Sequence, residues 1–481
     1  MKLRCAIALL LVPSATAIWP LPSSYSSGQT VLWIGNNVTV TYNCPDEVSS
    51  YSLRVGRNNA FYFHTADARS TQYVQSSLHA ANASISSSIV QAAIQRTYNT
   101  IFQQSFVPWK FHPRNSDFEP STSGKTYISS ITLQQSSSDP ANVLKPLAGE
   151  VNESYTLGLT EAGEVTITAV SSIGLVRGLT TFTQLFFAHS TGEPYTNLAP
   201  VEIQDAPKFS HRGINMDVAR SWFEVSDIKR MIDAAAYNKF NRFHLHATDS
   251  QSWPLEIPAL PELAAKGAYR SDLTYSPAEL AEIQYYGALQ GVEVIVEIDM
   301  PGHTASIWFA YPDLIAAFDV LPNWDTYAAE PPSGTLKLNS SAVYDFLDTL
   351  FGDLLPRVAP CSAYFHTGGD EVNRNAYNLD DTVRSNDTAI LQPLMQRFID
   401  HNHAQVRAAG LTPIVWEEML LMWNLTLGPD VVVQTWQSNE AVAATVAAGH
   451  KALFGNYNYW VRSASDVPDE PRRILTVLTV P

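Results

Sequence analysis

Short apolar runs alternate with helical segments from residue 213 to residue 454, and this alternation constrains the fold more than any other feature. The predicted strands are 213–217, 240–245, 292–297, 363–366, 412–416, 431–435 and 451–454. The predicted helices include 225–237, 277–290, 342–354, 389–409 and 439–448. Such alternation implies parallel strands joined by right-handed crossovers. Seven such units over about 270 residues are close to a (β/α)8 barrel and long for a doubly wound sheet.

A different pattern precedes the alternation. Residues 127–133 and 165–169 alternate with period two, as half-buried strands do, and 175–186 has the pattern of an amphipathic helix. This order predicts a separate α+β domain. The stretch Thr191–Pro200 has the Pro, Gly and polar residues of a domain boundary. The expected domains are 18–205 (α+β), 206–460 (barrel) and an atypical tail, 461–481.

The net charge of the chain limits the classes of partner that it can bind. There are 30 Lys and Arg against 46 Asp and Glu, which gives a net charge of −16. A surface this acidic repels phosphate backbones, so no nucleic-acid partner is expected. No apolar run of the sequence reaches the ~20 residues that span a bilayer, so no membrane partner is expected either.

The first 17 residues have the form of a secretory signal. Lys2 and Arg4 precede a short apolar stretch, and Ala15-Thr16-Ala17 resembles a cleavage site. The sequence therefore predicts a secreted, extracellular protein, or one in a vacuolar or lysosome-like compartment. Six Asn-x-Ser/Thr sequons, each a weak signal alone, become plausible glycan sites behind such a signal: Asn37, Asn82, Asn152, Asn339, Asn386 and Asn424.

Cysteines contribute little to the stability expected of this chain. Without the signal only Cys44 and Cys361 remain, and nothing in the sequence requires them to pair. Stability must therefore come from a hydrophobic core rather than from a disulfide framework.

Charged and aromatic residues follow six successive predicted strands. In a (β/α)8 barrel the chemistry lies at the carboxyl ends of the strands, so these residues point to one shared site. They are Asp217 and Arg220; His244, His246 and Asp249; Glu297, Asp299 and His303; His366, Asp370 and Glu371; Trp416, Glu417 and Glu418; and Trp436.

Asp370 and Glu371 form the centre of this predicted site. Adjacent side chains on a strand face opposite ways, but Gly368-Gly369 lets the chain leave strand geometry. Two neighbouring carboxylates disfavour joint ionisation, so one of them tends to hold a proton. A protonated acid beside an ionised one suits acid-catalysed cleavage of an acetal. Alone, an Asp-Glu pair is more often two solvated acids after a turn.

The other residues suit a sugar site. Arg220 offers a planar fork of donors to hydroxyls, although a lone Arg is more often in a surface salt bridge. His303 follows a rigid Asp-x-Pro-Gly turn and, with Asp249, could relay charge toward Glu371, although a buried histidine can equally bond to the backbone. Trp416 and Trp436 could wall a pocket, although core packing is the commoner role of a tryptophan.

Several motifs together resemble those of glycoside hydrolase family 20, the β-N-acetylhexosaminidases, with the secreted fungal enzymes closest. The motifs are Phe209-Ser-His-Arg-Gly-Ile-Asn-Met-Asp-Val-Ala-Arg220, Ala236-Tyr-Asn-Lys-Phe-Asn-Arg-Phe-His-Leu-His246, Asp299-Met-Pro-Gly-His303 and His366-Thr-Gly-Gly-Asp-Glu371. They occur in family order over about residues 200–460. The N-terminal segment more weakly resembles the family's zincin-like accessory domain.

The resemblance implies exo-hydrolysis of terminal N-acetylhexosamine from chitooligosaccharides and glycans, with the substrate's own 2-acetamido group as nucleophile and with retained configuration. It implies that Glu371 is the acid/base and that Asp370 orients the acetamide. Arg220 would bind hydroxyls, Asp249 and His303 would support Glu371, and Trp416 and Trp436 would line the acetamide pocket. It implies no cofactor and no metal. Homodimerisation is a family expectation.

The tail departs from the family pattern. The family's Tyr-x-Asp motif should align with residues 460–463, which contain neither residue, and no tryptophan follows Trp460. We therefore expect an atypical or truncated C-terminus, with the eighth strand missing or replaced by 474–480, weak substrate binding and poor folding. Open edge strands would then recruit other chains. A two-state melt with normal turnover would contradict this expectation.

Two other functions stay open from the sequence. One is a catalytically impaired, sugar-binding relative that lacks the C-terminal substrate motifs. The other is a metal-dependent hydrolase that uses His244 and His246, with His303 and His366 as further ligands. Metal analysis and the effect of a chelator on activity separate this last reading from the glycosidase.

Overall fold

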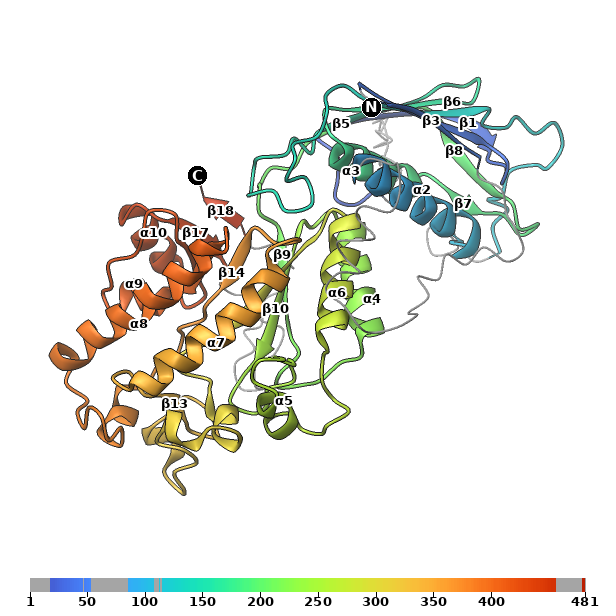
Figure 1. The fold of residues 1–481 in the computed structure, drawn as a ribbon. Helices are drawn as coiled ribbons and strands as arrows, with labels where there is room; N and C mark the ends of the chain where they lie inside the picture. The colour runs from blue at the N-terminus through green and yellow to red at the C-terminus, as the bar shows by residue number, and fades with distance from the viewer. Residues whose placement is uncertain are drawn as a thin grey trace, which may run out of the picture.

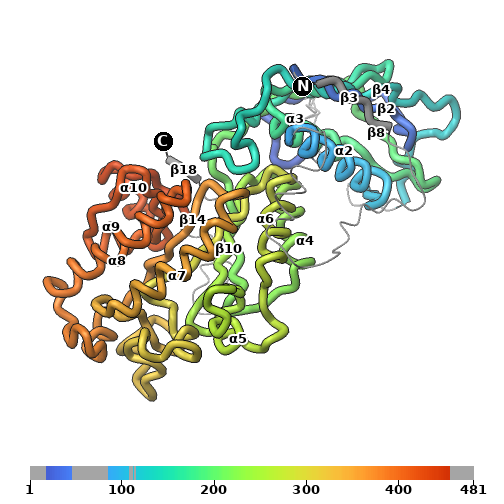
Figure 2. The backbone as a smooth tube through the Cα atoms, in the orientation of Figure 1, coloured from blue at the N-terminus to red at the C-terminus, as the bar shows by residue number. Residues whose placement is uncertain are grey.

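The computed structural model describes residues 18–45, 47–52, 85–107, 112, 115–455 and 478–480 (Figure 1). The predicted signal 1–17, the sequon Asn82 and most of the predicted tail lie outside the described residues. The described residues form two large sheets. In Figure 2 the chain passes from the first sheet, drawn blue to green, into the second, drawn green to red.

The first sheet is mixed and has the strand order β1-β8-β5-β6-β4-β2-β3, with β7 paired to β8. Its strands are β1 (Ser24–Trp33), β2 (Thr39–Cys44), β3 (Glu47–Ser52), β4 (Ser130–Gln135), β5 (Tyr155–Leu159), β6 (Glu164–Ala169), β7 (Phe187–Ala188) and β8 (Pro194–Asp205). The helices α2 (Ile85–Gln103) and α3 (Ser172–Thr183) pack against each other on one face of it (Figure 1). The predicted period-two strands and the amphipathic helix are confirmed, within a few residues at their ends.

Helix α3 lies unusually close to this sheet. Its N-cap Ser171 accepts a hydrogen bond from the Gly174 amide at 3.1 Å. A Cβ at Gly178 would come within 2.5 Å of the Ile167 side chain on β6, so glycine permits the contact. Every residue of α3 is buried, which explains its apolar character.

The second sheet contains seven parallel strands in the order β17-β16-β15-β14-β11-β10-β9. They are β9 (Gly213–Asp217), β10 (Arg242–Thr248), β11 (Glu293–Ile298), β14 (Tyr364–His366), β15 (Thr412–Trp416), β16 (Val432–Thr435) and β17 (Lys451–Phe454). All seven match predicted strands. Strands β10 and β11 are buried along their whole length, as parallel strands covered on both faces should be.

Helices cover the outside of this sheet in sequence order (Figure 1). They are α4 (Val225–Tyr237), α5 (Glu262–Gly267), α6 (Pro277–Leu289), α7 (Ser341–Val358), α8 (Thr388–Ala408), α9 (Glu417–Leu421) and α10 (Asn439–Ala447). Helix α4 packs against α6, α6 against α7 and α7 against α8. The five predicted helices are thus confirmed. Between β11 and α7, strands β12 (Ile315–Ala316) and β13 (Thr335–Leu336) pair as a two-stranded hairpin, and a loop connects the two strands.

The (β/α)8 prediction needs a correction at the end of this sheet. Among the described residues the curled sheet has seven parallel strands and does not close. Next to β17 lies β18 (Leu478–Val480), which pairs antiparallel to it, with Leu453 opposite Thr479. The substitute strand predicted within 474–480, for which no direction was predicted, therefore pairs over its described residues, 478–480. Antiparallel neighbours need no crossover helix, whereas a parallel eighth strand would need one.

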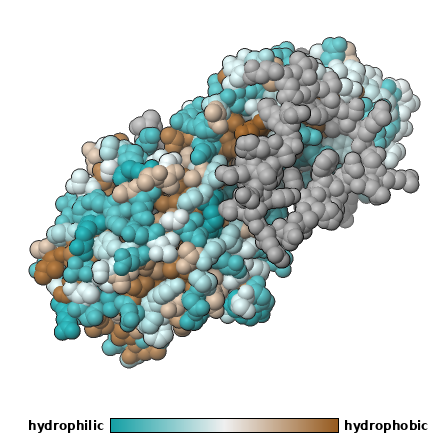
Figure 3. Space-filling view, viewed as in Figure 1, coloured by the Kyte–Doolittle hydropathy of each residue, from teal (hydrophilic) through white to brown (hydrophobic). Residues whose placement is uncertain are grey.

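The described surface agrees with several minor expectations. The five described sequon asparagines, 37, 152, 339, 386 and 424, are all exposed. Cys44 and Cys361 are both free, and burial raises the pKa of the Cys361 thiol to about 11. Figure 3 shows hydrophilic side chains mixed with smaller hydrophobic areas over the half that holds the parallel sheet. None of the helices in the described part of the chain combines the length and apolar character of a membrane span.

A buried ionic cluster joins the two sheets at Glu153, just before β5. Its carboxylate accepts from Arg177 Nε on α3 at 2.9 Å, from Arg212 Nη2 before β9 at 2.5 Å and from the Asn241 amide before β10 at 2.9 Å. Burial alone would raise the pKa of Glu153, but Arg177 and Arg212 lower it to about 2. This carboxylate therefore fixes the first sheet against the amino-terminal ends of the parallel strands.

We expect Glu153→Gln to lower the free energy of unfolding by about 3 kcal/mol at pH 7, because it leaves two buried guanidinium groups without their anion. The folded pKa lies below the usual value of about 4.3, so this contribution is present above that pH and is lost as pH falls toward 2. Urea melts from pH 7 to pH 3 should show the difference shrinking. Glu164→Gln, an exposed change on β6, should stay within about 0.5 kcal/mol of wild type. A pH-independent difference would contradict this interpretation.

Candidate active site

The structure brings the predicted site residues to the carboxyl-terminal edge of the parallel sheet. Arg220 Nη2, after β9, lies 2.9 Å from Asp249 Oδ2, after β10. Asp249 Oδ1 lies 3.1 Å from His303 Nδ1, after β11, and His303 Nε2 lies 3.4 Å from Glu371 Oε2, after β14. Asp370 Oδ1 lies 3.9 Å from the same His303 nitrogen. Four strand ends thus contribute to one continuous set of contacts.

The turn at residues 368–371 cannot be built without its glycines. Gly368 and Gly369 have φ of 71° and 108°, and a Cβ at Gly368 would fall 2.0 Å from Asp299 Oδ1. The Gly369 amide donates to that same oxygen at 2.8 Å. Glu371 itself has φ of 52°, a conformation that non-glycine residues seldom adopt outside functional sites. The predicted departure from strand geometry is confirmed.

The ionisation of Asp370 depends on a neighbour to which the sequence assigned no role. Burial raises the pKa of Asp370, while His303 and Asp299 oppose that rise. Burial and then Asp370 raise the pKa of Asp299 well above its usual range. The rise is larger at Asp299, so of these two carboxyls Asp299 is the one that tends to keep a proton. The predicted influence of Glu371 on Asp370 is present as well, because the Glu371 charge also raises the pKa of Asp370.

His303 is held as a cation between carboxylates. Burial alone would lower its pKa, but Asp249, Asp370 and Asp299 raise it well above 6.5. Burial alone would raise the pKa of Asp249, but His303 and His246 lower it far below its usual range. The side chain of Glu371 remains 30% exposed, so it can meet a substrate while it faces His303.

Arg220 is surrounded by acids. Nη1 donates to Asp217 Oδ2 at 2.8 Å, and Nη2 contacts Asp249 and Glu330. Glu330 comes from the β12–β13 loop, and it was missed because nothing in its local sequence marks it. Burial would lower the pKa of Arg220, but Asp249 and Asp217 raise it further above its usual value.

The two predicted tryptophans lie at different depths. Trp436, after β16, is half-buried, and its indole N–H donates to Glu418 Oε1 at 2.9 Å. The Gln437 amide donates to the same oxygen at 2.8 Å, while Glu417 accepts the backbone N–H groups of residues 436 and 437. Trp416 is 5% exposed and donates to Glu297 Oε1 at 2.7 Å, beneath the carboxylate pair. The predicted role of both as pocket walls stays a prediction.

Burial, followed by the nearby Asp370 charge, raises the pKa of Glu418 to about 7. Glu417 and Glu418 were noted in the sequence only as strand-end residues. Their contacts show that together they hold the backbone and the side chains of Trp436 and Gln437.

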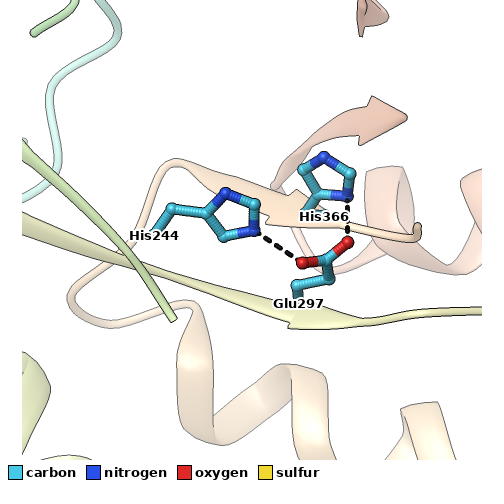
Figure 4. A group of neighbouring side chains, drawn as sticks. All are labelled: His244, Glu297 and His366. Carbon is cyan, nitrogen blue, oxygen red and sulfur yellow. Dashed lines mark hydrogen bonds and ion pairs between the residues drawn. The ribbon is translucent and has the colours of Figure 1, made fainter. Parts of the chain in front are cut away.

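A second cluster lies deeper, at His244, Glu297 and His366 (Figure 4). The figure shows both imidazoles directed at the Glu297 carboxylate, with His244 Nε2 at 2.8 Å and His366 Nδ1 at 3.2 Å. His366 Nδ1 also accepts the Gly368 amide, and burial lowers its pKa to about 3, so this imidazole is neutral and makes no true ion pair.

The side chains around Glu297 do not suit the metal site that stayed open in the sequence analysis. The three ligand-type atoms of this cluster lie within 4.8 Å of one another, but His246 and Trp416 also donate N–H groups to Glu297, at 2.5 Å and 2.7 Å. An indole N–H is a donor and cannot ligate a cation. The carboxylate is therefore satisfied by hydrogen bonds rather than arranged for an ion.

A family model described as glycosyl hydrolase family 20, catalytic domain, matches residues 209–473, more than half of the chain. The chain belongs to glycosyl hydrolase family 20. A second model, described as beta-acetyl hexosaminidase like, matches residues 18–185. The predicted family is confirmed, and with it the predicted class, a glycoside hydrolase of the β-N-acetylhexosaminidase type, while the alternative of an impaired sugar-binding relative is not favoured.

Relatives of the chain come from fungi, animals and plants. A β-hexosaminidase of Arthroderma benhamiae is 42% identical over 464 residues, which cover 92% of this chain and 75% of the relative. The β-hexosaminidase subunit beta of Homo sapiens is 30% identical, over 76% of this chain and 64% of the relative. The chain spans only 58% of a β-hexosaminidase 1 of Arabidopsis thaliana.

Solved family-20 structures share the fold. The Flavobacterium johnsoniae chitobiase superposes with a TM-score of 0.67 at 21% identity, covering 94% of this chain and 63% of that one. A β-N-acetylhexosaminidase of Streptomyces coelicolor gives a TM-score of 0.60 at 21% identity, covering 92% and 75%. These likenesses support the arrangement of an N-terminal domain followed by a TIM-type catalytic domain.

We expect Glu418→Ala to lower kcat/KM by about 5- to 150-fold, because it leaves the indole and amide donors without an acceptor, at about 1–3 kcal/mol. Glu418→Gln keeps an acceptor oxygen and should lose much less. Turnover of a chromogenic N-acetylglucosaminide measures both. Glu440→Ala, exposed on α10, is the matched control. Equal activity of the Ala and Gln variants would show that holding Trp436 is unimportant.

Proposed function

We propose that this chain removes terminal non-reducing N-acetylhexosamine units from chitooligosaccharides and glycans, with the substrate's acetamide as nucleophile. The observation that carries the proposal is the adjacent carboxyl pair Asp370–Glu371 after the Gly-Gly turn, with Glu371 facing the buried His303–Asp249 pair. An acetal needs an acid on one side and a stabilised nucleophile on the other, and this pair can supply both.

Glu371 is the proposed acid and base. It gives its proton to the glycosidic oxygen as the bond to the anomeric carbon breaks, and it later takes a proton from the water that opens the cyclic intermediate. The His303 cation at 3.4 Å stabilises the carboxylate left after the first transfer. Asp249 holds that cation in place from its other nitrogen.

Asp370 is the proposed partner of the acetamide. Its ionised carboxylate accepts the acetamide N–H, which turns the carbonyl oxygen toward the anomeric carbon and stabilises the positive charge that develops on the ring. The protonated Asp299 beside it supports this ionised form. The product of the first step is an oxazolinium ion, so two inversions at the anomeric carbon give net retention.

The remaining predicted residues would bind the sugar. Arg220 offers donors to ring hydroxyls, with Glu330 as a partner that a hydroxyl would share or displace. Trp436 would wall the acetamide pocket where Glu417 and Glu418 hold it, and Trp416 would close the pocket from below. Aromatic faces pack well against acetamide methyl groups.

The proposal also includes the domain bounds, the location, the glycan sites and the assembly expected from the sequence. The domains would be 18–205, of zincin-like type, and 206–460, followed by the tail 461–481. Residues 1–17 would direct export to the cell exterior or to a vacuolar or lysosome-like compartment, with glycans on the exposed sequons. The active form would be a homodimer.

We expect Glu371→Gln to lower kcat for a chromogenic N-acetylglucosaminide by about 10²–10⁴-fold, with KM changed only a few-fold, because the amide cannot donate the proton. Asp381→Asn, whose side chain is 62% exposed, is the control and should keep full activity. A wild-type chain that binds the sugar without turnover, and binds equally well after Glu371→Gln, would favour a sugar-binding protein.

A second test removes the nucleophile from the substrate. The chromogenic glucoside that carries a hydroxyl in place of the 2-acetamido group should react at least about 10³-fold more slowly, because an intramolecular nucleophile is worth a large effective concentration. Comparable rates on both substrates would indicate that a protein carboxylate attacks instead.

A further inference from the structure

Behind Glu371 the contacts continue well beyond His303 and Asp249. Asp249 Oδ2 lies 2.8 Å from His246 Nε2, and His246 Nδ1 lies 2.5 Å from Glu297 Oε2. Glu297 in turn accepts from His244 Nε2 and from the Trp416 indole. The row Glu297–His246–Asp249–His303–Glu371 therefore alternates carboxyl and imidazole groups from the sheet interior to its edge.

The contacts of His246 fix its charge, because the pKa of each carboxyl that it meets lies far below its usual range. Both of its ring nitrogens meet carboxylate oxygens, and an ionised carboxylate accepts hydrogen bonds but donates none. Both nitrogens must therefore carry a hydrogen, which makes the ring a cation. Burial would lower the pKa of His246, but Glu297 and Asp249 raise it well above 6.5, which agrees with the geometry.

His244 provides a contrast on the same strand. Its Nε2 donates to Glu297, while its Nδ1 accepts from the Asn215 amide at 3.1 Å. Only one of its ring nitrogens therefore meets a carboxylate, whereas both nitrogens of His246 do. His244 shares Glu297 with His246, yet among its described contacts none reaches Asp249.

We propose that His246 is a positioning residue for catalysis, a fixed cation that, anchored by Glu297, orients Asp249 and sets the charge that His303 presents to Glu371. This rests on the proposed function, because it concerns how the acid/base residue is tuned. His246 touches no substrate atom. It acts through Asp249 and His303, and it explains why a second buried imidazole and a second buried carboxylate lie behind the site.

The sign of the effect follows from the surrounding charges. The groups that face His303 are Asp249, Asp299, Asp370, Glu371, Glu330 and Arg220. The groups that face His246 are Glu297, Asp249, Asp299, the neutral His366, and the two residues that share its carboxylate oxygens, His244 on Glu297 and Arg220 on Asp249. Replacing His246 by a neutral residue removes a positive charge that lies closer to Glu371 along the row than the negative charge of Glu297 does, so the net change is a loss of positive charge. Asp249 then attracts the His303 proton more strongly, and Glu371 keeps its own proton to higher pH.

The test is the pH dependence of kcat in His246→Gln, with His244→Gln as the matched control. We expect the basic limb of the His246→Gln profile to move up by about one pH unit, the order of effect of one charge at an effective dielectric of about 20. We expect kcat to fall about tenfold, with KM changed less than about threefold. His244→Gln should lose stability through Glu297 but keep the wild-type limb.

A shift of equal size in both variants, or an unmoved limb in His246→Gln, would overturn the proposal, because a structural role alone predicts no difference between the two.

The wild-type protein provides a test that needs neither variant nor turnover. In ¹⁵N-histidine spectra both His246 nitrogens should stay protonated from pH 5 to pH 8, and a neutral ring at pH 6 would refute the proposal. If the spectra agree but the chain hydrolyses no hexosaminide, the proposed function fails and the charge row stands.

Discussion

The buried carboxylate of Asp249 is the group on which the site depends. It is fully inaccessible to solvent and lies at the end of β10. It meets His246 from its own strand, His303 from the segment after β11 and Arg220 from the segment after β9. A buried carboxylate costs several kcal/mol unless cations and hydrogen bonds surround it. Here the compensating cations are the residues that organise the site, so stability and function rest on the same contacts.

The parallel sheet explains why these residues meet. Side chains far apart in sequence come together because parallel strands present their carboxyl ends at one edge. Between Asp249 and Glu371 lie more than a hundred residues, yet one imidazole, His303, touches both. At the opposite end of the strands, Glu153 and its arginines join the first sheet to the second. One end of the strands thus holds a structural ionic cluster, while the other holds a reactive one.

The sequence predicted the strands, the helices and the central residues well because each leaves a local signal. Short apolar runs place the seven parallel strands, the pattern between them places five of the helices, and Gly368-Gly369 marks a turn before Asp370. Contacts made at long range left no such signal. Glu330 comes from a hairpin loop, and its meeting with Arg220 depends on how β12 and β13 fold. The proton on Asp299 depends on the burial of two carboxyls together, which spacing cannot reveal. The antiparallel direction of β18 was not predicted because the strand pattern is the same in both directions.

The interior of the site and its rim differ in how firmly they are held. Glu297 and Asp249 each have three or more partners in the interior, and all those partners come from strands or from the segments that directly follow them. At the rim, Glu330 reaches Arg220 from a loop, and Glu418 holds the Trp436 indole through one hydrogen bond. A sugar that enters can replace Glu330 at the guanidinium or shift the indole while the charge row behind Glu371 stays in place. On the proposed function, substrate recognition and proton transfer belong to different layers of one edge, and the rim can adapt without disturbing the ionisation of the acid.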